Sequence, residues 1–261
     1  FRSDYSVSIA TLFKASIAKA ILEKRFIETG NLRWSLLSVR YNGLEYLSRA
    51  HHISDLLARK ELVDNAIEEI KTVIEIDFPL GNEIYRDENG SVLVVPYLED
   101  KNGQNLLSFT IENRQDFKSY LYSRFSRSGE HPLDGEILPA IKLSQGLPGN
   151  DLLLTKITDW NSPTLEADKE SIAKWWESSE RNGEICTVCG LRPIGHGAPD
   201  NHWDAHLKDK HAGKKEPTLK CEVCKAQSRN ICWTCMERRG DRAKRWATSE
   251  LSTTIWLNEV A

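Results

Sequence analysis

The sequence predicts an α+β fold, in which helices cover one face of an antiparallel sheet and a small helical module follows. Two observations carry this prediction. Within the first 160 residues the segments occur in the order strand, helix, hairpin, helix, strand, which is the order of the ferredoxin-like βαββαβ unit. All six cysteines follow residue 185, in three Cys-x2-Cys pairs.

The first half of this unit begins with an amphipathic helix over residues 9–28, where apolar side chains recur at helical spacing. An aromatic and aliphatic run over residues 34–41 predicts the first strand. Asn42-Gly43 interrupts the pattern, and the long helical periodicity from Leu44 to Ile74 predicts one or two helices.

The second half opens with the clearest hairpin signal of the chain. Asn89-Gly90 separates strand-like runs over residues 83–86 and 91–95, and Asn-Gly supplies the positive φ angles of tight turns. Residues 112–127 predict a helix. Residues 137–143 predict a short strand, which Pro139 restricts to an edge because it lacks an N–H.

A last helix of this part is predicted after Asp168, which would cap it, through Trp175 and Trp176 to Arg181. The chain of 261 residues is long enough for one large domain or two ordinary ones. It begins at Phe1 and ends in a strand-like run without a partner, so we expect a piece of a longer protein. No apolar run could span a bilayer and no signal peptide is evident, so we expect no membrane partner.

Zinc is the metal that the cysteine spacing predicts. Two thiolates three residues apart can grip one tetrahedral ion from the same side, and a second pair completes the site. Paired thiols without a secretion signal favour a reducing cytoplasm. The candidate ligands are Cys186, Cys189, Cys221, Cys224, Cys232, Cys235, His202 and His206.

Two pairings of these ligands stay open, with one or two ions. In the first, Cys186 and Cys189 join His202 and His206 at the spacing of a zinc finger, and the other four cysteines form their own site. In the second, Cys186 and Cys189 join Cys232 and Cys235. The pair Cys221 and Cys224 then takes two histidines.

The charge is distributed unevenly. The net charge is −3, but residues 206–246 hold 12 Lys/Arg and 5 Asp/Glu, a net +7 that leaves −10 for the remainder. A dense cluster follows the last cysteine: Arg238, Arg239, Arg242, Lys244 and Arg245. On one helix face these cations would repel one another unless an anion lay against them, so we expect contact with RNA, DNA or an acidic protein. A solvated helix is the alternative.

Several segments, taken in order, resemble the large subunit of type III CRISPR effector complexes, in a divergent branch of that polymerase-palm family. They include Trp34–Leu37, Tyr41–Leu44, Pro79–Gly90 and Ile255–Ala261. Cys186–Pro193 and Cys232–Arg239 resemble the zinc-bearing linker of that family. The resemblance spans nearly the whole chain.

This resemblance implies antiviral defence, with other CRISPR effector subunits and guide RNA as partners. Such subunits carry two palms, between which ATP is bound with Mg²⁺ and converted to cyclic oligoadenylate. The implied organisation is an N-terminal connecting helix over 1–32, a ferredoxin-like palm domain over 33–160, a zinc-binding helical linker module over 161–248 and the start of a following domain over 249–261.

The departures from the family decide the expected activity. Neither the catalytic Gly-Gly-Asp-Asp of the palm nor the His-Asp dipeptide of the nuclease domain occurs. The positions that would meet the nucleotide are Asn42 and Gly43, which carry no acid, so we expect a nucleotide-binding first palm with no catalytic residue. The segment His51-His52-x2-Asp55 is interpreted as ordinary helix surface. The alternative function is a zinc-dependent nucleic-acid-binding or subunit-docking module that binds no nucleotide.

Overall fold

The structure is a computed structural model that describes residues 33–98, 103, 105–110, 115–129, 132–148, 163–177, 184–194, 196–197 and 230–245, with only the backbone over 241–245. The chain divides into two compact units. Unit 1 comprises Phe1–Tyr46 and Leu62–Glu166, and unit 2 comprises Leu47–Glu61 and Ala167–Ala261. The predicted helix over residues 9–28 lies outside the described residues.

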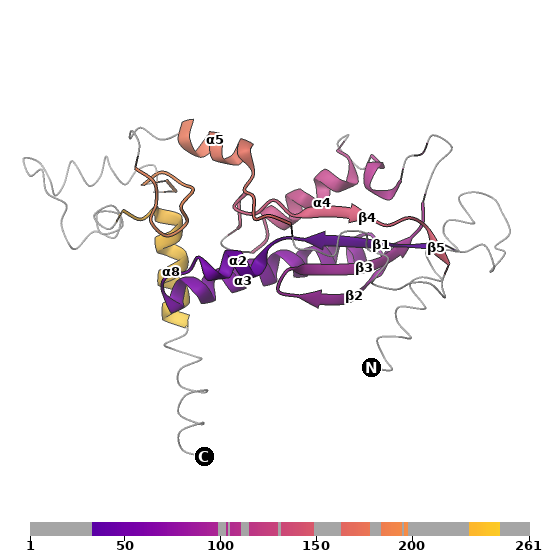
Figure 1. Ribbon diagram of the computed structural model, residues 1–261, viewed down its shortest axis with the longest axis horizontal. Coiled ribbons are helices and arrows are strands. Elements are labelled where there is room, and N and C mark those ends of the chain that lie inside the picture. Colours follow the sequence, from indigo (N-terminus) through magenta and orange to yellow (C-terminus); the bar gives the residue numbers. More distant parts are fainter. Residues whose placement is uncertain are drawn as a thin grey trace, which may run out of the picture. The chain divides into compact units, whose positions relative to one another are not determined.

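Unit 1 is built on an antiparallel sheet (Figure 1). Its strands are β1 (Arg33–Arg40), β2 (Asn82–Asp87), β3 (Gly90–Pro96), β4 (Ala140–Leu143) and β5 (Leu147–Pro148). They lie in the order β2-β3-β1-β4, and β5 also pairs with β1. In the register of the two central strands, Leu37 lies opposite Leu93. Helices and an antiparallel sheet together confirm the predicted α+β class.

The helices differ from the predicted ranges at their ends. The periodic stretch after Gly43 forms two helices, α2 (Gly43–Ser48) and α3 (Ile53–Thr72), and α3 continues as a π-helix over Val73–Asp77. The division between the units falls within α3, after Glu61. A short 3₁₀-helix, η3, covers Leu106–Ser108.

The next helix, α4, spans Phe117–Ser126 and begins where the carboxylate of Asp116 accepts the Ser119 amide. Such an N-cap satisfies an amide that the helix itself cannot bond. The last predicted strand was placed too early, because β4 starts only at Ala140, after Pro139. It pairs with β1 alone among the described strands, as an edge strand that follows a proline can.

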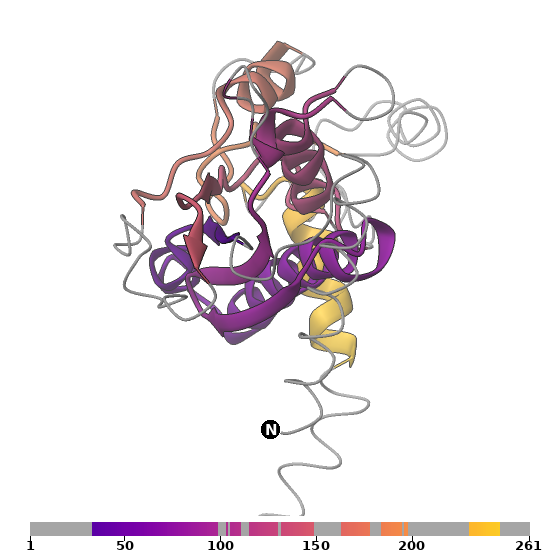
Figure 2. The same cartoon turned by 90° about the vertical axis from the view of Figure 1, so that its right-hand side faces the viewer.

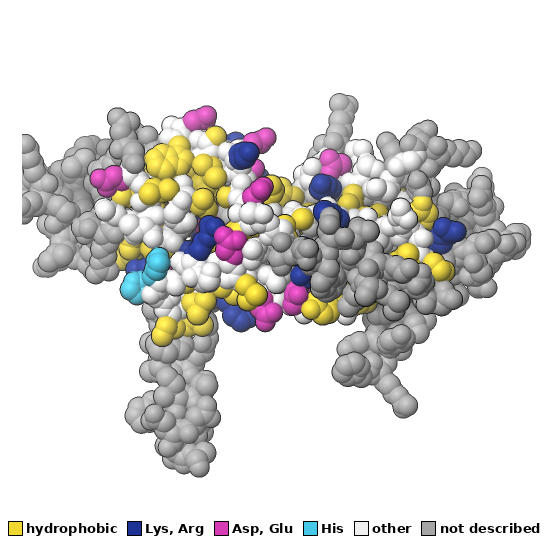
Figure 3. Space-filling model, viewed as in Figure 1, with side chains coloured by type: hydrophobic (Ala, Val, Ile, Leu, Met, Phe, Trp, Pro, Cys, Tyr) yellow, Lys and Arg dark blue, Asp and Glu magenta, His cyan; other side chains and the backbone are white. Residues whose placement is uncertain are grey.

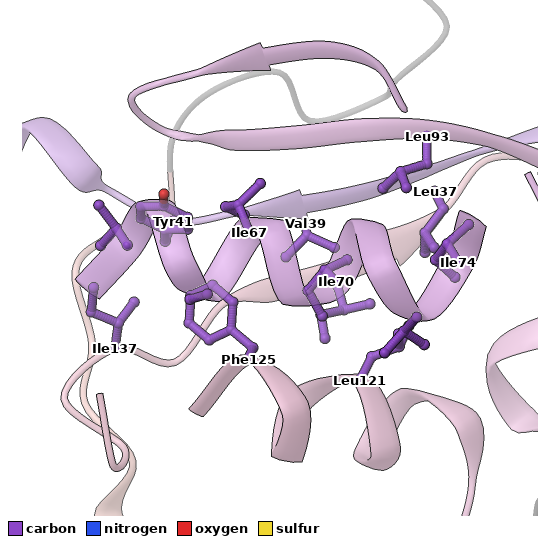
Figure 4. Packing of buried hydrophobic residues seen from close by; sticks show 14 of the residues in the cluster. Leu37, Val39, Tyr41, Ile67, Ile70, Ile74, Leu93, Leu121, Phe125 and Ile137 are labelled. Carbon is purple, nitrogen blue, oxygen red and sulfur yellow. The ribbon is translucent and has the colours of Figure 1, made fainter. Parts of the chain in front are cut away.

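One apolar core joins the sheet to the helices of unit 1 (Figure 4). Alternate residues of β1, Leu37 and Val39, face this core, since successive side chains of a strand point to opposite sides. Ile70 of α3 and Phe125 of α4 pack against the same face. All four side chains are fully buried. Burial of this apolar surface is the main favourable term for the unit.

The other residues of the central strands form a second apolar layer. Trp34 and Leu36 of β1 pack with Val92 and Val94 of β3, and all four are buried. The sheet is therefore apolar on both faces along its central strands. Seen along the strands in Figure 2, it has the twist expected of such a sheet.

The predicted hairpin is confirmed, and its glycine is required by a close approach. β2 and β3 pair antiparallel across the turn before Gly90, which has a φ of 131°. A Cβ atom at Gly90 would lie 2.0 Å from the carbonyl oxygen of Val39 on the neighbouring strand. Only glycine fits both the angle and the contact.

Unit 2 contributes the start of α3, the helix α5 (Lys169–Glu177) and the helix α8 (Trp233–Arg245). The carboxylate of Asp168 accepts the Ser171 hydroxyl and lies near the first amides of α5, as predicted for a cap. Among the described residues, no helix is both long enough and apolar enough to cross a bilayer.

Candidate metal centre

The first cysteine pair lies on a short, tightly hydrogen-bonded loop of unit 2. The Cys186 amide donates to the Arg192 carbonyl (2.8 Å), and the Gly190 amide donates to the Cys186 carbonyl (2.9 Å). Gly190 has a φ of 66°, in the left-handed region where other residues are strained. The Arg192 amide points at the Cys189 Sγ (3.4 Å). This loop turns both thiols to the same side.

The second pair lies at the beginning of α8 (Figure 1, yellow). Cys232 directly precedes the helix, and Cys235 occupies its first turn. The positive end of a helix dipole stabilises negative charge at such positions, and it thereby favours thiolates. Asn230, with a φ of 56°, turns the chain into this helix.

The two pairs meet although more than 40 residues separate them. The Cys232 amide donates to the Cys186 Sγ (3.2 Å), and the Thr187 amide donates to the Asn230 carbonyl (2.9 Å). The four sulfurs lie within 4.8 Å of one another. A tetrahedron of thiolates around zinc has sulfurs about 3.8 Å apart. The four cysteines are free of disulfides and could therefore hold a metal ion.

Proton sharing among the thiols reflects this crowding. Hydrogen bonds from Cys189, and then from Cys232 and Cys235, hold the pKa of Cys186 far below its usual value. The pKa of Cys189 is raised by Cys186 and lowered by the other two thiols, with a net fall to about 6. The hydrogen bond with Cys186 raises the pKa of both Cys232 and Cys235. A bound cation removes this competition, because coordinated thiols lose their protons outright.

Helix α5 supports the loop of the first pair. The Trp176 Nε1 donates to the Leu191 carbonyl (3.0 Å), and the Trp175 ring lies beneath the Arg192 guanidinium, 4.3 Å from ring centre to carbon. Arg192 is fully buried and Trp175 is nearly so. A desolvated cation over an indole face is attracted by about 2 kcal/mol. Both tryptophans of α5 therefore hold the loop in place, one through a hydrogen bond and one through a cation–π contact.

The beginning of α3 contacts both halves of the site. The Arg59 Nη2 donates to the Val188 carbonyl (2.6 Å), between the first two cysteines. Both oxygens of Asp55 accept from Arg239, at 2.7 Å from Nε and 2.6 Å from Nη2. The side chain of Asp55 is only 4% exposed. These contacts lie within unit 2.

The interpretation of His51-His52-x2-Asp55 as helix surface is therefore wrong for Asp55. The two histidines precede α3 and are exposed, and histidine side chains are visible on the surface in Figure 3 (cyan). The aspartate is buried because Arg239 compensates its charge at both oxygens.

The basic cluster is also divided by the fold. Arg238 is 6% exposed, and Arg239 is held by Asp55. Asp55, an acid of the same unit, thus pairs with Arg239, for which the sequence suggested an external anion. Arg242, Lys244 and Arg245 lie on α8, where only the backbone is described. The remaining predicted ligands, Cys221, Cys224, His202 and His206, lie outside the described residues.

Asn42 and Gly43 lie in unit 1, where β1 passes into α2. Asn42 caps the helix: its Oδ1 accepts the Glu45 amide (3.0 Å), and its Nδ2 donates to the Glu45 carboxylate (2.9 Å). The Gly43 amide donates to the Asn89 Oδ1 (3.1 Å). A Cβ atom at Gly43 would lie 1.8 Å from the Glu88 carbonyl oxygen. The close approach of the Glu88 backbone thus explains why residue 43 is glycine, and this explanation requires no bound ligand.

Several supporting residues of the centre were not predicted: Asp55, Arg59, Trp175 and Arg192. One signal could have suggested the first two. Asp55 and Arg59 are four residues apart and so share one face of a helix, and Arg239 likewise follows Cys235 by four.

A matched pair of glycine substitutions tests the loop geometry. Gly190 and Gly240 both have open space where a Cβ would lie, but only Gly190 has a positive φ. Gly190→Ala should lower the stability of unit 2 by about 1 kcal/mol, because an L-residue is strained in the left-handed region. Gly240→Ala should raise it by up to about 1 kcal/mol, since alanine favours a helix interior. Thermal unfolding of the two variants measures both changes, and shifts of the same sign would contradict the assigned backbone.

No protein-family model matches the chain, and no match is found among curated proteins or among solved structures. The residues and their geometry are therefore the basis for the function of this protein.

Proposed function

We propose that the four-cysteine centre of unit 2 holds a structural zinc ion. The observation that carries this proposal is that Cys186, Cys189, Cys232 and Cys235 place four sulfurs within 4.8 Å of one another. A tetrahedral set of four sulfurs suits zinc or an iron–sulfur cluster. Four protein ligands leave no open position for a substrate or a reactive water, so the role is structural.

A second ion is proposed from the sequence. Because the first centre uses two of the three Cys-x2-Cys pairs, Cys221 and Cys224 need other partners, and His202 and His206 lie in the same intervening segment. Two thiolates and two imidazoles are a common zinc set.

The zinc proposal predicts two ions per chain in protein purified without chelator. Cys186→Ser should lose one ion and destabilise unit 2, because binding of a structural zinc contributes on the order of 10 kcal/mol. Cys224→Ser should also lose one ion but keep the first centre. Elemental analysis of the three proteins measures the metal and identifies it. Wild-type protein with no zinc would contradict the proposal.

We further propose that unit 1 is a ferredoxin-like palm, the first and non-catalytic palm of a type III CRISPR effector large subunit in antiviral defence. The strand order β2-β3-β1-β4, with β1 antiparallel to both neighbours, supports this proposal because it is the order of the βαββαβ unit. The family resemblance of Tyr41–Leu44 and Pro79–Gly90 supports it as well. In such a protein, a second palm would supply the Mg²⁺-binding acids that form cyclic oligoadenylate from ATP.

In this proposal the first palm contributes Asn42 and Gly43 to nucleotide binding. The amides of Gly43 and Leu44 already point at the Oδ1 of Asn89, at 3.1 and 3.4 Å. A phosphate oxygen would take over the place of that acceptor. The chain would then bind ATP without changing it.

The palm proposal predicts that the chain with ATP and Mg²⁺ makes no oligoadenylate. It also predicts that Asn42→Ala weakens ATP binding about 10-fold, the loss of one hydrogen bond to a charged group. Asn105→Ala is the matched control, because Asn105 is also a helix-capping asparagine of unit 1. Calorimetric titration with ATP compares the three proteins. Oligoadenylate from the chain alone, or equal affinities throughout, would contradict the assignment.

The second candidate function is a nucleic-acid-binding or subunit-docking module that binds no nucleotide. One observation favours it: Asn89 already satisfies the amides that a phosphate would need. With Arg238 buried and Arg239 paired, we propose that RNA contact falls to Arg242, Lys244 and Arg245.

This candidate predicts that Arg242→Ala/Lys244→Ala/Arg245→Ala weakens binding to single-stranded RNA. The slope of log K against log[salt] should become shallower by about 2, because three phosphate contacts are lost and binding then releases fewer counterions. Both proteins, the wild type and the triple variant, are titrated with single-stranded RNA at several salt concentrations.

A triple substitution in unit 1 controls for net charge. Lys71, Arg86 and Arg124 are partly exposed cations that pair with acids of their own unit. Their replacement by alanine removes the same formal charge and should leave the slope unchanged. Equal affinities and slopes in both triple variants would remove RNA as the partner of α8.

A further inference from the structure

The first two turns of α3 lie against both halves of the metal centre. Arg59 donates to the carbonyl of Val188, which stands between the first two cysteines. Asp55, one turn earlier on the same face, accepts from Arg239, which stands one turn beyond Cys235. One short helical segment, distant in sequence, is therefore bonded to each of the two elements that supply the sulfurs.

These contacts are too well buried to be incidental surface pairs. The side chains of Asp55 and Arg239 are 4% and 20% exposed, and Arg59 as a whole is 7% exposed. An arginine that bonds both oxygens of a carboxylate fixes its orientation as well as its distance. A metal centre of four thiolates and one divalent cation carries two negative charges, and the net positive charge of Arg59, Arg239 and Asp55 at its margin offsets part of them.

We propose that Asp55 and Arg59 are positioning residues of the metal centre, which hold the two cysteine pairs in the register that one ion requires. The proposal rests on the metal binding proposed above. Metal binding fixes the same contacts in return, so loading of the centre orders residues 53–61. Such coupling is reciprocal, because the ion and the helical segment stabilise the same arrangement.

The test compares metal affinity in the full chain. Asp55→Asn keeps the shape of the side chain, but it removes the charge and one of the two acceptors for Arg239. Groups that orient metal ligands change affinity about 10- to 100-fold when they are replaced. We expect a loss of that size for Asp55→Asn when Zn²⁺ is titrated against a competing chromophoric chelator.

Asp87→Asn is the matched control. Asp87 is also an aspartate paired with an arginine, Arg40, at 2.8 Å, but the pair lies in unit 1. Its replacement should leave the zinc affinity unchanged. A folded Asp55→Asn chain that binds zinc as tightly as the wild type would overturn the positioning role while leaving the zinc proposal intact. A wild-type chain that takes up no zinc would overturn both, and so the two failures are distinguishable.

Hydrogen exchange of the wild-type chain decides the matter if Asp55→Asn does not fold. Removal of the metal should speed amide exchange over residues 54–61 and leave exchange in β3, within unit 1, unchanged. Unchanged exchange over residues 54–61 after complete metal removal would overturn the inference.

Discussion

The meeting of four thiols is the constraint on which unit 2 depends. Its described core is small: Cys186, Cys232 and Cys235 are buried with Ile231, and Val188 packs against them. In this described part of the unit, a bound ion would add to the modest free energy that so little apolar surface contributes. The thiols compete for protons when they are crowded together, which is the condition that a bound cation relieves.

Unit 1 is stabilised differently. Its sheet and helices enclose one continuous core in which Leu37, Ile70, Leu93 and Phe125 are fully buried. Burial of apolar surface stabilises a core of this kind. The described core of unit 2 differs, because it is made largely of the cysteines that could hold a metal ion.

The sequence was most informative where a structure depends on neighbouring residues. Asn89-Gly90 predicted the hairpin because the turn itself requires those residue types. The Cys-x2-Cys spacing predicted the candidate metal ligands, but not which pairs join. Which pairs join depends on the path of the chain over the more than 40 residues between Cys189 and Cys232. No local sequence pattern encodes that path. The structure joins Cys186 and Cys189 to Cys232 and Cys235, the second of the two pairings considered.

The ion pair of Asp55 and Arg239 explains why charge counting along the chain overstates what α8 offers to a partner. The two residues are 184 positions apart, so local density presents Arg239 as one more surface cation. In the fold, the hydrogen bond with Asp55 raises the pKa of Arg239, and the thiols Cys235 and Cys186 add to the rise.

Arginine suits this position because its planar fork bonds a carboxylate at two points and is less costly to desolvate than an ammonium group. The positive charge after the last cysteine is therefore divided. Arg238 and Arg239 face the interior of unit 2, where the first is buried and the second pairs with the buried carboxylate of Asp55. These two arginines are therefore taken up within the unit and do not add to what α8 offers a phosphate or an acidic protein.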